Sequence, residues 1–241
     1  MSKNRIQYLY LHSDDKLVKK SFSNTKKFMD ELSILRKLKS SMFINYPIHI
    51  SNIDKTMFFT YYPFDLFAIV NHKLLSVSEI LKLYFQILLA VQHLHQMGIE
   101  HHDIKLENCL VDENFKKIYL IDFEFATHSY QVNPENVGSG TPAYQPPESY
   151  FENTLCLPSF SKKDIWSLGI MYVIIKYDYF PIQKNTIDEY RNFIHQSKQI
   201  AFSTSIRNCF DLVPQQRVSI HTLIYNMDRE FNKKYSKKHE K

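Results

Sequence analysis

The chain has 241 residues, of which 44% are hydrophobic and 23% charged, a balance typical of a soluble globular protein. This length is enough for one domain, or for two lobes that share a cleft, with a buried core. The formal net charge of +5 is partly concentrated after Arg229, where a short basic tail is typical of a solvated terminus. A patch for acidic partners or a nuclear address is the alternative interpretation of this tail.

The three cysteines are far apart and odd in number, and no C-x-x-C motif occurs. Neither a disulfide framework nor a zinc site is indicated, so we expect a reducing compartment. The N-terminus has no signal-peptide pattern, and no stretch is long and apolar enough to cross a bilayer. These features predict a cytoplasmic or nuclear protein without a membrane partner.

The first 62 residues predict a small sheet with one helix. Residues 6–11 and 16–22 resemble two strands joined by a turn at residues 12–15, and residues 56–62 resemble a buried strand. Apolar residues at offsets of three and four predict an amphipathic helix over residues 25–38.

The rest of the chain is predicted to be mainly helical. A long amphipathic helix over residues 78–97 ends at Gly98, and a strand is expected over residues 117–123. The expected later helices span residues 164–177, 187–194 and 220–231.

Two short motifs carry the chemistry. HHDIKLEN at residues 101–108 separates Asp103 from Asn108 by five positions with Lys105 between them, and LIDFE follows at residues 120–124. The order and spacing of the two motifs resemble the catalytic loop and metal-binding loop of eukaryotic-type protein kinases. The phosphoryl transfer that this resemblance implies needs a carboxylate to accept the proton of the substrate hydroxyl, and a second carboxylate with an amide to hold Mg²⁺.

Four further segments extend the resemblance over roughly residues 6–227. GTPAYQPPE at residues 140–148 is similar to the end of a kinase activation segment, and DIWSLG at residues 164–169 to the buried helix that anchors the catalytic loop. LVPQQR at residues 212–217 supplies Arg217, which we expect to pair with Glu148. ELSIL at residues 31–35 is similar to the helix whose Glu pairs with the ATP-binding lysine.

The resemblance implies one α+β kinase domain with two lobes, a trimmed β-rich lobe at residues 1–62 and a helical lobe at residues 63–241, with ATP between them. It implies Asp103 as the catalytic base and Lys105 as a phosphate contact typical of serine/threonine kinases. Asn108 and Asp122 would hold Mg²⁺. The expected nucleotide-binding residues are Lys19, with Lys20 as the alternative, Glu31, Tyr62, Asp65 and Leu110, and Thr60 is expected at the back of the adenine pocket.

Three departures from the kinase pattern bear on activity. Residues 1–97 contain no glycine, so the glycine-rich loop that covers the phosphates is absent from this sequence, and too few residues precede Lys19 to hold it. Glu124 stands where the metal-binding loop has glycine, which would restrict the backbone and put a carboxylate beside the metal, favouring Mn²⁺. His102 replaces the arginine that often reads a phosphorylated activation loop.

Three functions compete at this point. The first is an active serine/threonine kinase that uses Mg-ATP on a protein substrate, and the second is a pseudokinase that serves a regulatory protein partner. The third is a small-molecule kinase of related fold. No nucleic-acid partner is expected, and the sequence leaves the oligomeric state open.

Overall fold

The structure of the chain is a computed structural model that describes residues 5–10, 16–39, 41–128, 140–150, 161–199 and 204–236. The turn predicted at residues 12–15 lies outside these ranges.

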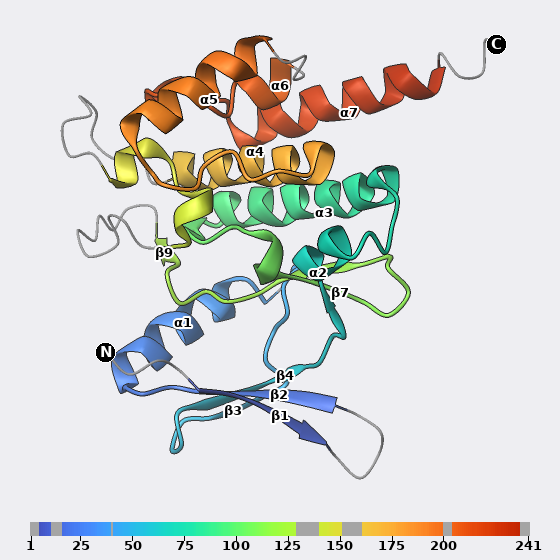
Figure 1. The fold of residues 1–241 in the computed structure, drawn as a ribbon. Helices are drawn as coiled ribbons and strands as arrows, with labels where there is room; N and C mark the ends of the chain where they lie inside the picture. The colour runs from blue at the N-terminus through green and yellow to red at the C-terminus, as the bar shows by residue number, and fades with distance from the viewer. Residues whose placement is uncertain are drawn as a thin grey trace.

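The small lobe is an antiparallel sheet with one helix (Figure 1). Its strands run in the order β1-β2-β4-β3. They are β1 (Arg5–Tyr10), β2 (Lys16–Ser21), β3 (His49–Ser51) and β4 (Thr56–Thr60). Figure 1 shows helix α1 (Thr25–Lys37) between this sheet and the helical part of the molecule.

Helix α1 begins where its sequence provides a cap. The Asn24 side chain accepts a hydrogen bond from the Lys27 amide at 2.8 Å and so satisfies a free N–H group of the first turn. Phe28, Leu32 and Leu35 fall on one helix face and are buried. This apolar face fixes which side of the helix turns inward.

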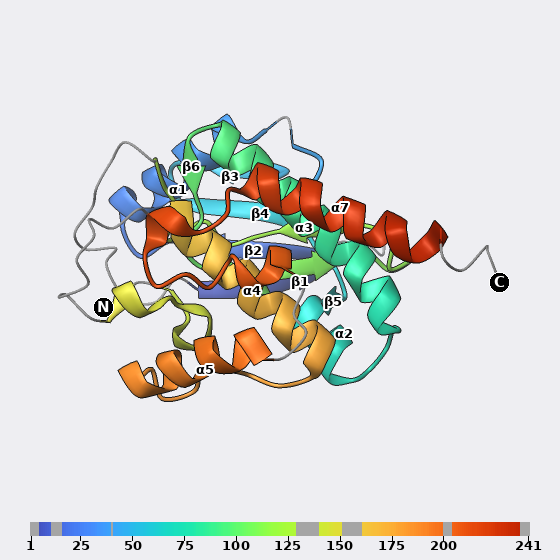
Figure 2. The same ribbon diagram turned by 90° about the horizontal axis from the view of Figure 1, so that it is seen from above.

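The large lobe is built on two long helices, α3 (Val77–Gln96) and α4 (Ser161–Tyr177), which Figure 2 shows crossing the centre of the molecule. Ser76 and Glu79 form a reciprocal capping box at the start of α3. The remaining helices are α2 (Leu66–Asn71), α5 (Ile187–Gln199), α6 (Thr204–Arg207) and α7 (Ile220–Ser236). The short strands are β5 (Phe64–Asp65), β6 (Ile99–Glu100), β7 (Cys109–Val111), β8 (Ile118–Leu120) and β9 (Thr127–His128).

Short one-turn 3₁₀ helices shape the loops between these elements. They are η1 (Leu106–Asn108), η3 (Pro142–Tyr144), η4 (Pro147–Ser149) and η5 (Pro214–Gln216). Three of the four begin with proline, whose fixed φ suits the first helical position and which needs no hydrogen-bond partner for its nitrogen.

The predicted α+β architecture is confirmed, with a small sheet-based lobe and a helical lobe. The chain leaves the sheet at Thr60 and enters the large lobe at Phe64, close to the predicted junction. In the described part of the chain, the helices lack either the length or the apolar character needed to cross a lipid bilayer.

Candidate active site

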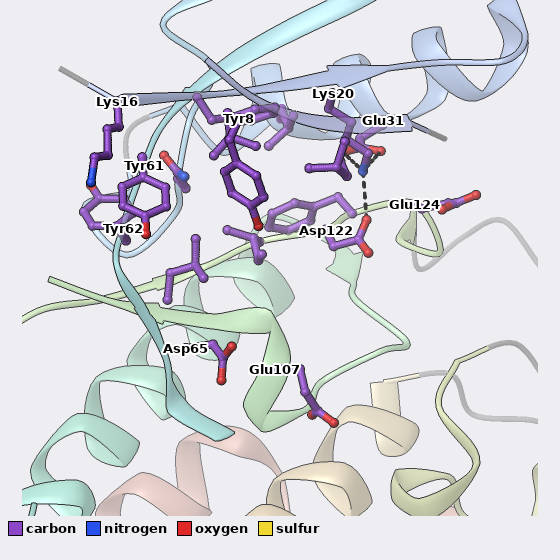
Figure 3. Close-up of a pocket in the computed structure, with 18 of the residues that line it drawn as sticks. Tyr8, Lys16, Lys20, Glu31, Tyr61, Tyr62, Asp65, Glu107, Asp122 and Glu124 are labelled. Carbon is purple, nitrogen blue, oxygen red and sulfur yellow. Dashed lines mark hydrogen bonds and ion pairs between the residues drawn. The ribbon is translucent and has the colours of Figure 1, made fainter. Parts of the chain in front are cut away.

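One end of the site is an ion network centred on Lys20. The Lys20 Nζ lies 2.8 Å from both Glu31 carboxylate oxygens and 2.8 Å from Asp122 Oδ1 (Figure 3). Strand β2, helix α1 and the loop after β8 each contribute one of these residues. The network therefore ties the small lobe to the large one.

The prediction that Lys19 pairs with Glu31 is wrong. Successive strand residues point to opposite faces, and Lys20 is the residue of β2 that faces α1. The Lys19 ammonium instead lies 5.9 Å from the centre of the Phe58 ring. Both lysines belong to strand β2. Which of them pairs with Glu31 depends on which face of the strand packs against α1, and the sequence of the strand does not contain that information.

The protonation states within the network follow from two carboxylates that share one ammonium. Burial works against a charged Lys20, but Glu31 and Asp122 outweigh it and raise the pKa of Lys20. Burial likewise opposes ionisation of Asp122, yet contact with Lys20 lowers its pKa. Burial raises the pKa of Glu31; Lys20 opposes this rise without cancelling it, and nearby Asp122 adds to it. Asp122 is therefore the better anion of the pair.

The other end of the site surrounds Asp103. Its carboxylate accepts hydrogen bonds from the Thr141 amide at 2.7 Å, from the Thr141 hydroxyl at 2.8 Å and from Asn108 Nδ2 at 3.0 Å. The Lys105 ammonium lies 2.8 Å from the same carboxylate and donates to the Thr141 hydroxyl. This arrangement brings a carboxylate, an ammonium and a hydroxyl together, which is a geometry able to handle a proton on a substrate hydroxyl.

The two ends are joined through their loops. The Ile121 amide donates to the Asn108 carbonyl at 3.0 Å, which holds the residue before Asp122 against the Asp103 loop. Lys105 also contributes to lowering the pKa of Asp122, after the larger effect of Lys20. The Asn108 side chain donates its Nδ2 hydrogens to Asp103. Its side-chain oxygen, Oδ1, is therefore the atom that could bind a cation.

Asp164 of α4 holds the backbone of the loop that leads to Asp103. Its two carboxylate oxygens accept the amide N–H groups of His101 and His102 at 3.0 and 2.9 Å, and His95 contacts it at 2.9 Å. Burial alone would raise the pKa of Asp164, but the bond to His95 and the other histidines lower it well below its usual range. A buried carboxylate thus fixes the position of the residues before Asp103.

Gly140 lies against this loop, at the start of the segment that runs to Glu148. Its φ is +107°, and a Cβ there would collide with the Gln145 side chain and the His102 carbonyl. Glycine is needed because both the backbone conformation and the close approach exclude a side chain.

A cavity of about 810 Å³ opens between the lobes beside Lys20 and Asp122. This volume is within the range of ligand sites for small molecules and cofactors. The predicted nucleotide-binding residues Tyr62, Asp65 and Leu110 all line it. Asp65 also accepts the Ala68 amide at 2.7 Å as the cap of α2, so one of its oxygens already has a structural role.

Two lining residues differ from the sequence-based prediction. Thr60, expected at the back of the pocket, has an exposed side chain, whereas its neighbour Phe59 lines the cavity. Tyr8 of β1, which sequence reasoning did not single out, points into the cavity (Figure 3) and contacts Tyr61 edge-on at 5.9 Å. The period-two pattern of β1 could have placed Tyr8 on one face, but not identified that face as the cavity roof.

The expected pair of Glu148 and Arg217 is confirmed. Two guanidinium nitrogens of Arg217 each lie 2.6 Å from a Glu148 carboxylate oxygen, and both side chains are buried. The same guanidinium stacks 5.0 Å from the centre of the Trp166 ring. The segment after Gly140 is thereby anchored to the C-terminal third of the chain.

Comparison with known proteins identifies this arrangement. A family model described as the protein kinase domain matches residues 12–233, which is most of the chain. The chain belongs to the protein kinase family.

Several serine/threonine kinases are similar to this kinase domain. The serine/threonine-protein kinase ppk34 of Schizosaccharomyces pombe is 31% identical over 182 residues, covering 70% of this chain and 50% of ppk34. The serine/threonine-protein kinase SKS1 of Saccharomyces cerevisiae is 32% identical, covering 72% of this chain and 39% of SKS1. The meiosis-specific kinase mek1 of S. pombe is 31% identical, covering 66% and 39%. The chain thus spans half or less of the length of these relatives.

Two of the three departures from the kinase pattern can be placed in the structure. Glu124 does not require a strained backbone, because Asp122, with φ of +63°, carries the positive φ of this loop and Glu124 does not. Its carboxylate forms an ion pair with Lys27 of α1, and Figure 3 shows it pointing away from Asp122. The expectation that Glu124 restricts the backbone and faces the metal ligand is therefore wrong.

His102, the second departure, is buried and bonded within the kinase domain. Its Nε2 lies 2.8 Å from the Thr127 hydroxyl of β9. Burial lowers the pKa of His102 to about 4, although Asp164 opposes this shift. Near neutral pH His102 is therefore uncharged and cannot replace an arginine as a phosphate-binding cation.

Among the described residues, no three His, Cys, Asp or Glu side chains gather into a metal-binding cluster. Cys109 and Cys209 are buried free thiols, and burial raises the pKa of Cys209 to about 12.

Proposed function

We propose that this kinase domain, spanning residues 1–241, transfers the γ-phosphoryl group of ATP to serine or threonine hydroxyls of proteins. The observation that carries the proposal is a pair of neighbouring ion clusters. The Lys20–Glu31–Asp122 network lines the inter-lobe cavity, and the bond from the Ile121 amide to the Asn108 carbonyl holds the Asp103–Lys105–Asn108 cluster next to Asp122. Phosphoryl transfer depends mainly on positioning and electrostatic stabilisation, and these groups supply both.

Each residue has a distinct role in this proposal. Asp103 orients the substrate hydroxyl and accepts its proton, while Lys105 stabilises charge on the transferred group. Lys20 contacts phosphate oxygens and Glu31 holds its ammonium in place. Tyr62, Leu110 and Asp65 contact the adenosine, and Tyr8 covers it from β1.

A divalent cation fits this donor set. Asp122 lines the cavity with one oxygen bonded to Lys20, and Asn108 offers a carbonyl oxygen, and oxygen ligands are what Mg²⁺ and Mn²⁺ prefer. A bound cation would neutralise phosphate charge. We propose Mg²⁺, with Mn²⁺ as the alternative. Mn²⁺ was favoured because the Glu124 carboxylate would lie beside the metal, and its pairing with Lys27 weakens that argument.

Protein substrates are favoured because the Glu148–Arg217 pair anchors the segment after Gly140, which forms the peptide platform in protein kinases. The free thiols of Cys109 and Cys209 suit a reducing compartment, so we propose the cytoplasm or the nucleus.

A pseudokinase that binds a regulatory protein partner is the second candidate. The lack of glycine in residues 1–97 favours it, because backbone N–H groups of a glycine-rich loop normally hold the phosphates. Each lost contact would weaken nucleotide binding by about 1 kcal/mol.

A pair of adjacent substitutions tests the proposal. Lys20→Met should weaken Mg-ATP binding about tenfold or more, because a charged hydrogen bond to phosphate is lost. Lys19→Met, on the same strand but the opposite face, should leave binding unchanged. Isothermal titration calorimetry with Mg-ATP measures both. Equal affinities for Lys20→Met and the wild type would contradict the proposed site.

A further inference from the structure

An ion pair links the two lobes beside the candidate active site. Lys27 belongs to the first turn of α1 in the small lobe, and Glu124 follows Asp122 by two positions in the large lobe. Their ammonium and carboxylate are in contact although they are 97 positions apart in the sequence. The side chains are 36% and 23% exposed, so solvent screens the pair only in part.

Lys27 and Glu31 are four residues apart on α1, so they lie on the same helix face, one turn apart. Glu31 reaches Asp122 through Lys20, and Lys27 reaches Glu124 directly. Two neighbouring turns of α1 are therefore held by two residues of one loop. A helix fixed at two points cannot rotate about either contact alone.

Acidic side chains outnumber basic ones in this region. Three carboxylates, Glu31, Asp122 and Glu124, face two ammonium groups, Lys20 and Lys27. Burial raises the pKa of Glu31, Lys20 opposes this rise, and Asp122 and Glu124 add to it.

We infer that Glu124 is a positioning residue, which through Lys27 holds α1 inward so that Glu31 meets Lys20. Glycine at this position would remove the second attachment of α1 without relieving any backbone strain, because Glu124 has no positive φ. The inference rests on the proposed function only for its kinetic consequence.

Hydrogen exchange on the whole chain tests the attachment directly. In Glu124→Gln and in Lys27→Met, amides of residues 25–37 should exchange about twofold to fivefold faster, while those of the buried helix α4 stay unchanged. The double charge reversal Lys27→Glu with Glu124→Lys should restore slow exchange. Lys26→Met is the matched control, because Lys26 is an exposed neighbour on the same turn, and its exchange should equal that of the wild type.

A kinetic measurement shows whether the attachment matters for chemistry. Glu124→Gln and Glu124→Gly should each raise KM for ATP and lower kcat by about twofold to fivefold, and the charge reversal should recover part of both. If the wild type transfers no phosphate, the proposed function fails, but exchange still decides the role of Glu124. Unchanged exchange of α1 in both single variants would overturn the inference, and so would a Glu124→Gly variant with faster transfer.

Discussion

His102, which stands where protein kinases often have arginine, is buried, neutral and hydrogen-bonded. It has φ of +66°, a left-handed conformation that histidine and asparagine tolerate better than most residues. Its bond to Thr127 connects the catalytic loop to β9 without a phosphate group. A hydrogen bond between two neutral side chains thus takes the place of the contact between an arginine and a phosphate group.

This burial predicts a pH-dependent stability. The pKa of His102 in the folded protein is about 4, below its usual value near 6.5. The neutral, buried His102 therefore contributes fully to the stability of the fold above about pH 6.5, and this contribution is lost as the pH falls towards 4. The loss amounts to about 3 kcal/mol of unfolding free energy. His102→Asn, which suits the left-handed backbone, should remove this part of the acid sensitivity. Urea unfolding at a series of pH values measures the difference, and parallel curves for variant and wild type would contradict it.

At the residue scale, the sequence predicted which residues of one loop come together better than it predicted contacts between distant segments. Asp103, Lys105 and Asn108 converge as expected because their spacing lies within one loop. The lysine was misassigned because two adjacent lysines differ only in the strand face they occupy. The partner of Glu124 could not be predicted because Lys27 is remote in sequence.

At the scale of elements, long periodic segments were predicted well and short ones were not. The helix predicted over residues 25–38 is α1 (Thr25–Lys37), and that over 78–97 is α3 (Val77–Gln96). Helix α2 and strand β3 were missed, because six and three residues are too few to show a hydrophobic period. The predicted strands over residues 56–62 and 117–123 are shorter in the structure.

The buried pair of Glu148 and Arg217 predicts a large stability effect. Glu148→Ala leaves the Arg217 guanidinium buried without its carboxylate, so unfolding free energy should fall by about 3–5 kcal/mol. Arg191→Ala is the control, because Arg191 forms an exposed pair with Asp188 at 3.8 Å and should change stability by less than about 0.5 kcal/mol. Chemical denaturation compares them, and similar values for the two variants would show that the buried pair does not anchor the segment.

At the scale of the whole molecule, the two lobes enclose a cavity whose roof is the two-strand hairpin of β1 and β2. Residues 1–97 contain no glycine, so the sequence predicts that this roof binds phosphates weakly. Tyr8 offers ring surface in the cavity, but a side chain does not supply the backbone N–H groups that bind phosphates.

Nucleotide binding should accordingly be weak. With a Kd of about 1 mM, several-millimolar Mg-ATP would stabilise the protein by only about 1 kcal/mol. A domain of this size would then melt about 2–4 °C higher. Thermal unfolding with increasing Mg-ATP measures the shift, and a large shift at micromolar ATP would show that the missing glycines do not limit affinity.

The most direct measurement of the central claim is transfer of the γ-phosphoryl group from radiolabelled ATP to a generic basic protein, for the wild type and Asp103→Asn. We predict labelling of serine or threonine by the wild type and a loss of about 10²–10⁴-fold in Asp103→Asn with unchanged folding. Glu113→Gln, an exposed acid outside the cavity, should label as the wild type does. Equal labelling by Asp103→Asn and the wild type, or no labelling by the wild type at saturating Mg-ATP or Mn-ATP, would contradict the account.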